Sequence, residues 1–431
     1  MLRRLLGSGV WRMGDSMFRM GAAVLVNAYV ARYLSPAGFG ILSFGAAMAT
    51  LVTAIAQFGM QTVVVRELIR RPQQRTEILG SALVLRLAAG AASILLAVGA
   101  TAVLRPGDRQ ADLIVLIVAA IALPRAWDVI DYDYQSRIEA RPVVIARNVS
   151  FVMFTLLRPL LVLLHAPVEA FAFALTGEAV FAAVLMLRRW RHDGLMVGVG
   201  AATRAELRDL VVMSWPLVIA GLSMIVYMRI DAIMLATMVG DIGVGLFSAA
   251  VKISEALYFI PSAVVATVAP ALTAALGRSR AEHERQILQV MRFLVWIALA
   301  VAVVFATFSH LIILRLYGAA YAPAAAVLSI HAWIGVLMAI NMAGSQWLIN
   351  EGYFHYNMYQ TLAGAVANIG LNLLLIPRYG IVGSAMASFC GQFVSVMLMP
   401  ALMPKTWPLF KLQLAGLVPL EPRWLLTRFS R

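Results

Sequence analysis

The chain has 431 residues, of which 62% are hydrophobic and only 13% are charged. Soluble domains are closer to half apolar and a quarter charged, so an ordinary soluble enzyme or binding module is excluded. The formal net charge is +14, but the basic residues lie between apolar runs and form no continuous face, which excludes a nucleic-acid partner. The one cysteine, Cys390, permits no internal disulfide, and neither a metal nor a cofactor is expected.

The N-terminal segment carries basic residues ahead of an apolar run, as a signal peptide does. Arg12, Asp15 and Arg19 interrupt this run, and no small-residue cleavage site follows at the right distance. We therefore expect residues 13–34 to form the first membrane span.

Apolar runs recur along the whole length, and most reach the roughly 20 residues that a spanning helix needs. The sequence therefore predicts an all-α polytopic membrane protein with about twelve transmembrane helices. The predicted spans are 13–34, 39–63, 78–103, 112–131, 142–164, 168–187, 209–238, 243–270, 288–314, 324–349, 357–377 and 381–403.

The longest connection, residues 188–208, carries five arginines and divides the chain. It predicts a six-helix lobe over residues 1–200 and a second six-helix lobe over residues 201–403. Residues 404–431 mix aromatic and basic side chains. They are expected to form a basic cytoplasmic tail at the membrane interface, with a partner-docking role as the alternative.

Basic residues predict the orientation of the spans. The connections after spans two, four, six and eight are rich in arginine, as are both termini, whereas the opposite connections hold few basic residues. Both termini are therefore predicted to be cytoplasmic. The loop near Glu351 should also face inward, although it carries no basic residue.

A short motif occurs twice, at equal positions in the two predicted lobes. Gly38-Phe-Gly-Ile-Leu-Ser43 reappears as Gly243-Val-Gly-Leu-Phe-Ser248, and each copy opens the second span of its half after an outward turn. The sixth spans correspond more loosely, with Gly177 answering Gly391. This pattern indicates a parallel duplication, which predicts two bundles related by a pseudo-two-fold axis with a cavity between them.

Ionisable residues inside spans cost about 2.5–3.5 kcal/mol each on insertion scales, so they need a reason to be there. Five of those in this chain are basic and are candidates to line a substrate cavity: Arg19, Arg86, Arg158, Arg229 and Lys252. Three are acidic and are candidates for ion or proton coupling: Asp231, Glu255 and Glu178. The excess of cations favours an anionic substrate, and the planar arginine fork suits a diphosphate.

Structural roles compete with these assignments. Arg19, Arg86 and Arg158 are placed where a long side chain can snorkel toward the interface. Lys252 and Glu255 stand three residues apart on one helical face and could neutralise each other. Glu178 could form a hydrogen bond between helices and have no role in coupling.

Several segments together resemble a known family. They are Ala31-Arg-Tyr-Leu-Ser-Pro36, Val65-Arg-Glu-Leu68, Arg229-Ile-Asp231 and Leu371-Asn-Leu-Leu-Leu-Ile-Pro-Arg-Tyr-Gly380. The chain is similar to the polysaccharide-biosynthesis flippases (Wzx-type, O-antigen exporters), whose superfamily includes the multidrug and toxin extrusion (MATE) transporters. The resemblance implies a MATE-like fold of two lobes in the bacterial inner membrane.

The resemblance also implies a function. Members carry an undecaprenyl-diphosphate-linked oligosaccharide from the cytoplasmic to the periplasmic leaflet by alternating access, for O-antigen, capsule or exopolysaccharide assembly. The implied partners are the lipid-linked oligosaccharide, membrane lipids, and a polysaccharide polymerase and chain-length regulator.

Two other functions compete. A drug/cation antiporter on the same fold should have an acid-dominated cavity, which is the reverse of the pattern here. A membrane polymerase or ligase of polysaccharide units should have a sizeable outward loop, and every predicted outward loop is short. The sequence holds no Walker loop, HExxH motif or nucleophile elbow, so an enzyme is not expected.

Overall fold

The computed structural model describes the backbone of residues 2–57 and 59–418. Side chains are described over the same part except for residues 2–20, 55–56 and 216–224, so the predicted cavity residue Arg19 lies outside the described side chains. All secondary structure in this part is helical, as predicted.

The chain divides into two compact units, which are described separately below. Residues Tyr33–Gly245 form one, here called the N-terminal unit, and Met1–Arg32 with Leu246–Arg431 form the other, the C-terminal unit. The first predicted span thus falls with the C-terminal helices and the seventh with the N-terminal helices. The lobe boundary near residue 200 stays a prediction.

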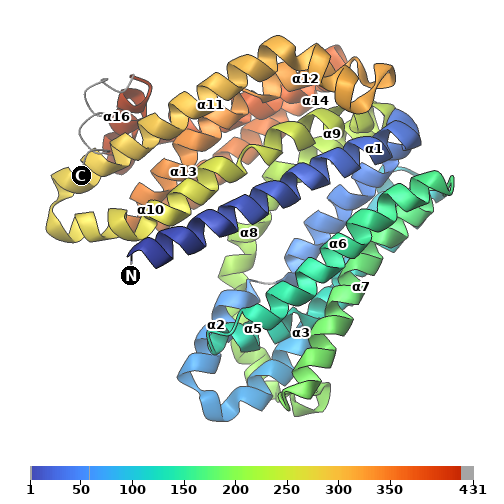
Figure 1. Cartoon of the computed structure of the whole chain (residues 1–431), viewed down its shortest axis with the longest axis vertical. Coiled ribbons are helices and arrows are strands. Elements are labelled where there is room, and N and C mark those ends of the chain that lie inside the picture. The colour runs from blue at the N-terminus through green and yellow to red at the C-terminus, as the bar shows by residue number, and fades with distance from the viewer. Residues whose placement is uncertain (1, 58, 419–431) are drawn as a thin grey trace. The chain divides into compact units, whose positions relative to one another are not determined.

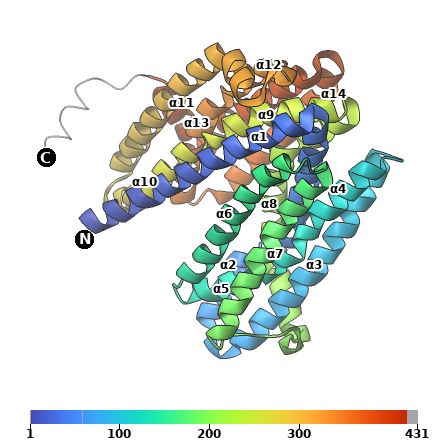
Figure 2. The same cartoon turned by 45° about the vertical axis from the view of Figure 1, so that its right-hand side comes forward.

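The N-terminal unit begins within the long helix α1 (Leu2–Gln57) and ends just after α8. Its α6 and α7 lie side by side in both views (Figures 1 and 2). The other elements of the unit are α2 (Met60–Arg70), η1 (Pro72–Gln74), α3 (Arg75–Leu104), α4 (Arg109–Ala119), η2 (Ala120–Ala122), η3 (Pro124–Asp128), α5 (Val129–Ser136), α6 (Arg141–Leu163), α7 (Val168–His192), η4 (Val199–Ala201) and α8 (Arg204–Met238).

The C-terminal unit is built around α11, which packs against α12 and α13. The short helix α16, in the predicted tail, also packs on α11, where Gly416 touches Met291. The elements of the unit are α9 (Asp241–Ala256, from Leu246 on), α10 (Phe259–Arg278), α11 (Arg280–Tyr317), η5 (Ala319–Tyr321), α12 (Ala324–His331), α13 (Ile334–Asn350), α14 (Phe354–Phe393), a π-helical turn (Val394–Leu398), α15 (Met399–Leu402), η7 (Pro404–Thr406) and α16 (Trp407–Gly416).

Within the described part, nine helical segments are long and apolar enough to cross a membrane. Two of them contain a non-helical residue in the left-handed region, Ser35 (φ 63°) and Gly380 (φ 55°), each next to a predicted boundary between spans. Pro36 follows Ser35 and cannot donate a backbone hydrogen bond, which helps to end the first span. Each bend divides its segment into two crossings, and α8, which is not among the nine, occupies the seventh predicted span. The segments are therefore consistent with twelve crossings. The chain is a multi-pass α-helical membrane protein.

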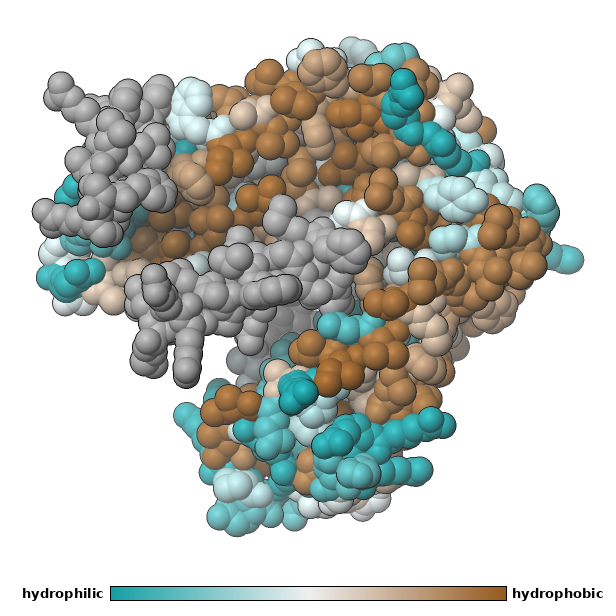
Figure 3. All heavy atoms as spheres, viewed as in Figure 1, coloured by the Kyte–Doolittle hydropathy of each residue, from teal (hydrophilic) through white to brown (hydrophobic). Residues whose placement is uncertain are grey.

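The surface of the N-terminal unit agrees with this conclusion. Large apolar side chains on α6 and α7 are exposed, among them Leu156, Leu163 and Phe173 at 69%, 68% and 62%. Hydrophilic residues gather instead at the end of the unit near α2 and α5 (Figure 3). An apolar belt beside a polar end suits helices surrounded by lipid.

The two copies of the repeated motif meet in the N-terminal unit, where α1 crosses the first turn of α9. A Cβ atom on Gly40 would overlap the carbonyl oxygen of Asp241, and one on Gly245 would overlap that of Pro36. Gly40 and Gly245 hold equivalent places in the motif, and each oxygen belongs to the residue four positions before the other glycine. The contact is therefore nearly symmetric, as a duplication predicts.

Ion pairs secure both ends of the N-terminal unit. Next to the glycine crossing, Arg105 donates to both carboxylate oxygens of Asp241, at 2.6 and 2.9 Å. At the opposite end, Arg71 donates to both carboxylate oxygens of Glu206, at 2.9 Å each, and this hydrogen bonding raises the pKa of Arg71. Such bidentate pairs are stronger than ordinary surface contacts.

The loop near Glu351 finds a basic partner in the C-terminal unit. Glu351 lies 3.4 Å from Arg280, which stands at the start of α11 in the arginine-rich connection after the eighth predicted span. The two connections therefore lie on the same side of this unit, as the predicted topology requires. The missing positive charge of one loop is supplied by its neighbour.

Candidate functional site

A cluster of charged side chains lies inside the N-terminal unit, where the fourth predicted span loses its α-helical geometry. Instead of one helix, residues 109–136 form α4, the two 3₁₀ turns η2 and η3, and α5. Pro124 stands at the first position of η3. The turns pack against α3 and α7, and Gly90 of α3 lets the backbone of Ala122 approach closely.

Arg86 of α3 is the most buried cation of this cluster, at 3% exposure. Its guanidinium donates to the Tyr132 hydroxyl at 2.6 Å, to the Arg125 carbonyl at 2.5 Å and to Asp128 at 3.3 Å. The side chain also lies over the ring of Tyr132, 5.7 Å from its centroid. Arg86 of α3 therefore holds η3 in place through contacts with η3 itself and with α5.

Arg147 of α6 approaches the same turn from another side. It lies 3.1 Å from Asp128 and 3.0 Å from Asp131. Arg86 and Arg147 thus share Asp128, and both carboxylates of the turn region have basic partners. The sequence indicated neither acid as part of a site.

Arg158 and Glu178 form an ion pair at 2.8 Å between α6 and α7. The two residues were predicted separately, as a cavity cation and as a coupling acid, with no partner evident for Glu178. Their side chains are 12% and 28% exposed, so the pair is largely buried. It satisfies the charges of two neighbouring spans, which agrees with the expected interhelical hydrogen bond.

Arg125 is a further charged residue that sequence reasoning missed. It is exposed, although it lies within a candidate membrane span. Asp128, Glu178, Arg86 and Arg147 act on it electrostatically. Among the described residues, no hydrogen bond or ion pair to its guanidinium is formed. A signal was present in the sequence, because Arg125, Asp128 and Asp131 recur at a spacing of three directly after Pro124.

The remaining predicted residues lie on α8 and α9. Arg229 is half-buried and Asp231 is buried, both on α8 in the N-terminal unit. Lys252 and Glu255 are half-buried on α9 in the C-terminal unit. All four take part in polar or electrostatic interactions. Their roles in substrate binding and ion coupling stay predictions.

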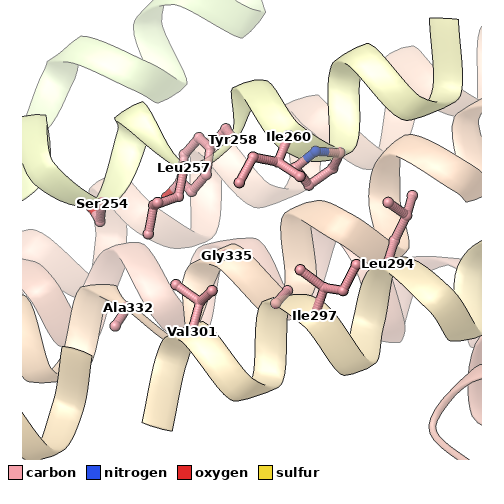
Figure 4. A pocket seen from close by; sticks show the side chains of 11 residues that line it. Ser254, Leu257, Tyr258, Ile260, Leu294, Ile297, Val301, Ala332 and Gly335 are labelled. Carbon is pink, nitrogen blue, oxygen red and sulfur yellow. The ribbon is translucent and has the colours of Figure 1, made fainter. Parts of the chain in front are cut away.

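A pocket in the C-terminal unit lies where two spans are interrupted. Residues 257–258 separate α9 from α10, and residues 332–333 separate α12 from α13. Side chains from the first interruption and from α11 face one another across the pocket (Figure 4), which holds about 470 Å³, open solvent included. Ser254 at its edge forms a 2.7 Å hydrogen bond with the buried His331. The walls are otherwise mostly apolar, so this pocket suits a hydrocarbon group better than a charged one.

Solved structures of transporters share this fold. An inward-facing multidrug resistance MATE family transporter of the MOP superfamily superposes with a TM-score of 0.74, at 17% identity, over 91% of this chain and 96% of that one. The lipid II flippase MurJ, in an inward closed conformation, gives a TM-score of 0.73 at 12% identity, over 94% and 90% of the two chains.

A third solved structure shares the fold. It is a MOP superfamily transporter from Pyrococcus furiosus, described as having a binding pocket of reverse polarity, with a TM-score of 0.58 at 16% identity over 95% and 96% of the chains. Identities this low establish the fold alone. No curated protein sequence matches the chain.

Two family models match the sequence itself. The model of the family described as "MatE" matches residues 216–374. The model described as "Polysaccharide biosynthesis protein" matches residues 7–276, which is more than half of the chain. The chain therefore has the fold of MOP superfamily transporters, and it belongs to the polysaccharide biosynthesis protein family.

Proposed function

We propose that the protein is a flippase for an undecaprenyl-diphosphate-linked oligosaccharide. It moves this lipid from the cytoplasmic to the periplasmic leaflet of the bacterial inner membrane by alternating access. The product supplies O-antigen, capsule or exopolysaccharide assembly, where a polymerase and a chain-length regulator are its expected partners.

The observation that carries the proposal is the excess of arginine within the spans of the N-terminal unit. The described cluster joins four arginines to three carboxylates: Arg86, Arg125, Arg147 and Arg158 to Asp128, Asp131 and Glu178. A net positive charge inside a membrane is costly unless it meets water or an anion. The planar arginine fork binds phosphate groups through two parallel hydrogen bonds, so a diphosphate suits such a site.

Deletion of the gene tests the proposal directly. The deletion strain should lose surface polysaccharide and accumulate a complete lipid-linked oligosaccharide in the inner membrane. This glycan should be shielded from periplasmic glycosidases and become accessible after the gene is restored. A strain that keeps normal surface polysaccharide and accumulates no such lipid would contradict the proposal.

Alanine at Arg229 or Lys252 is expected to abolish surface polysaccharide display without lowering protein level. Each change removes a positive charge that we assign to the substrate pathway. Display is measured by immunoblot of the extracted polysaccharide, and protein level by an epitope tag. Arg109→Ala is a suitable control, since that exposed arginine lies at the start of α4. Full display by both variants would refute the cationic pathway.

A drug/cation antiporter remains the second candidate, supported by the MatE match over residues 216–374. This function would depend on the acids Asp231, Glu255 and Glu178, rather than on the arginines. Proton-driven efflux of ethidium from cells that express the chain would support it. Loss of that efflux in Asp231→Asn, with surface polysaccharide unchanged, would favour it over the flippase.

A reporter fused to the C-terminus is expected to be cytoplasmic, because twelve crossings return the chain to the side where it began. Green fluorescent protein at this position should fluoresce, and alkaline phosphatase should be inactive. A second fusion in the short outward turn near Gly107 serves as the opposite control. Active phosphatase at the C-terminus would overturn the even number of spans.

A further inference from the structure

Two of the arginines in the N-terminal cluster already form ion pairs with protein carboxylates. Arg86 is 3% exposed and donates to Tyr132, Asp128 and the Arg125 carbonyl. Arg147 lies within ion-pair distance of both Asp128 and Asp131. These contacts order the protein around η3, although the Arg147 side chain is itself 46% exposed.

Arg125 differs from both. Its backbone lies in η3 directly after Pro124, whose own φ angle is fixed, and its carbonyl oxygen accepts a hydrogen bond from Arg86. Its side chain is nevertheless exposed, and none of the described residues forms a hydrogen bond or ion pair with it. The network therefore presents one guanidinium whose five N–H donors are not used by any of the described residues.

The depth of Arg125 makes this arrangement hard to explain as a surface charge. Its partner Arg86 lies eleven residues (86 − 75) along α3 from Arg75, which corresponds to roughly 16 Å at 1.5 Å per residue. The hydrocarbon core is about 30 Å thick, so the Arg86–Arg125 contact lies near its middle. Charged side chains at this depth usually face the interior of the helix bundle or a water-filled cavity.

The carboxylates nearby attract Arg125 electrostatically, but other arginines share them. Asp128 is already approached by Arg86 and Arg147, and Glu178 by Arg158. With Arg125 included, the cluster has four arginines and three carboxylates. One positive charge is therefore left unbalanced. An anionic ligand would meet this excess positive charge.

We propose that Arg125 is the residue of the N-terminal unit that binds the diphosphate of the lipid substrate halfway across the membrane. Arg86 and Arg147 hold the turn that presents it. The assignment rests on the proposed flippase function and names the contact that selects a phosphorylated lipid over an uncharged one. The guanidinium donates two parallel hydrogen bonds to the phosphate oxygens, which a lysine cannot reproduce.

Binding to the purified full-length protein in lipid nanodiscs tests the assignment, with undecaprenyl diphosphate and undecaprenol as probes in native mass spectrometry. The wild type should bind the diphosphate in preference to the alcohol. Arg125→Gln should weaken diphosphate binding roughly 10- to 100-fold, the usual value of hydrogen bonds to a charged group, and leave the alcohol unaffected. The affinity of Arg125→Lys for the diphosphate should lie between those of the wild type and Arg125→Gln. Arg109→Gln should bind both lipids as the wild type does.

A labelling experiment covers the case in which Arg125→Gln fails to fold. The only natural cysteine is Cys390, so Cys390→Ser provides a cysteine-free background. Arg125→Cys in that background should react with a water-soluble cationic thiol reagent, and undecaprenyl diphosphate should slow the reaction at least about tenfold. Undecaprenol should not slow it.

The outcomes separate the two proposals. If the wild type prefers undecaprenyl diphosphate but Arg125→Gln binds it equally well, the role of Arg125 is wrong and the flippase function stands. An Arg125→Cys variant that the diphosphate does not protect leads to the same conclusion. If the wild type shows no preference for the diphosphate over the alcohol, both the assignment and the proposed function fail.

Discussion

Alanine at Gly40 or Gly245 is expected to destabilise the N-terminal unit severely, although each change adds a single methyl group. In either variant the new Cβ atom would overlap a backbone carbonyl oxygen, and a backbone atom cannot turn aside as a flexible side chain does. Overpacking of this kind costs about 1–3 kcal/mol or more. The helices would have to separate and would strain the neighbouring Arg105–Asp241 ion pair. Loss of monodisperse protein after heating, followed by fluorescence-detected chromatography, measures the effect.

The crossing provides its own internal test. Because one separation of the helices relieves both overlaps, the Gly40→Ala/Gly245→Ala double variant should lose less stability than the sum of the two single losses. Gly99→Ala and Gly370→Ala are matched controls, since a Cβ atom on either helical glycine meets no atom within 4 Å. These should be neutral or stabilising by up to about 1 kcal/mol. Equal behaviour of all four single variants would contradict the close crossing.

Asp133→Ala is the second change for which we expect a large loss of stability. Asp133 is fully buried and accepts hydrogen bonds from Arg75, at 2.8 and 2.6 Å, and from the indole of Trp190 at 2.7 Å. Its removal leaves a largely buried guanidinium and a buried indole N–H without their acceptor. Breaking a buried pair in this way costs about 3–5 kcal/mol. The same heating assay should show a large drop in melting temperature.

One variant divides the Asp133 network, and a second, at a more exposed ion pair elsewhere, serves as a control. Trp190→Phe removes only the indole donor and should cost less than Asp133→Ala, although it also changes the packing. Glu284→Ala breaks a more exposed ion pair with Arg280, whose side chains are 33% and 57% exposed, and should cost at most about 1 kcal/mol. If Asp133→Ala were no worse than Glu284→Ala, the buried network would contribute little to stability.

Hydropathy and local backbone chemistry determined much of the fold before any tertiary contact was known. Long apolar runs can satisfy their backbone only as helices in lipid, so the membrane class followed from composition. Ser35-Pro36 and Gly380 lie where the structure bends, because both places combine a residue that leaves helical geometry with a predicted end of a span. The repeated glycine motif also pointed to a duplication, and its two copies meet in the structure.

Only the tertiary structure decided which charged side chains form ion pairs and which are exposed. Helical periodicity shows which residues share a face of one helix, but not which helix that face meets. Arg158 and Glu178 were therefore predicted apart and are found 2.8 Å from each other. Arg86 looked like a cavity cation but is buried by its contacts with the 3₁₀ turn, while Arg125, which attracted no notice in the sequence, is exposed. The interruption of the fourth span causes this exchange, because a 3₁₀ turn rotates its side chains away from the positions that a continuous α-helix would give them.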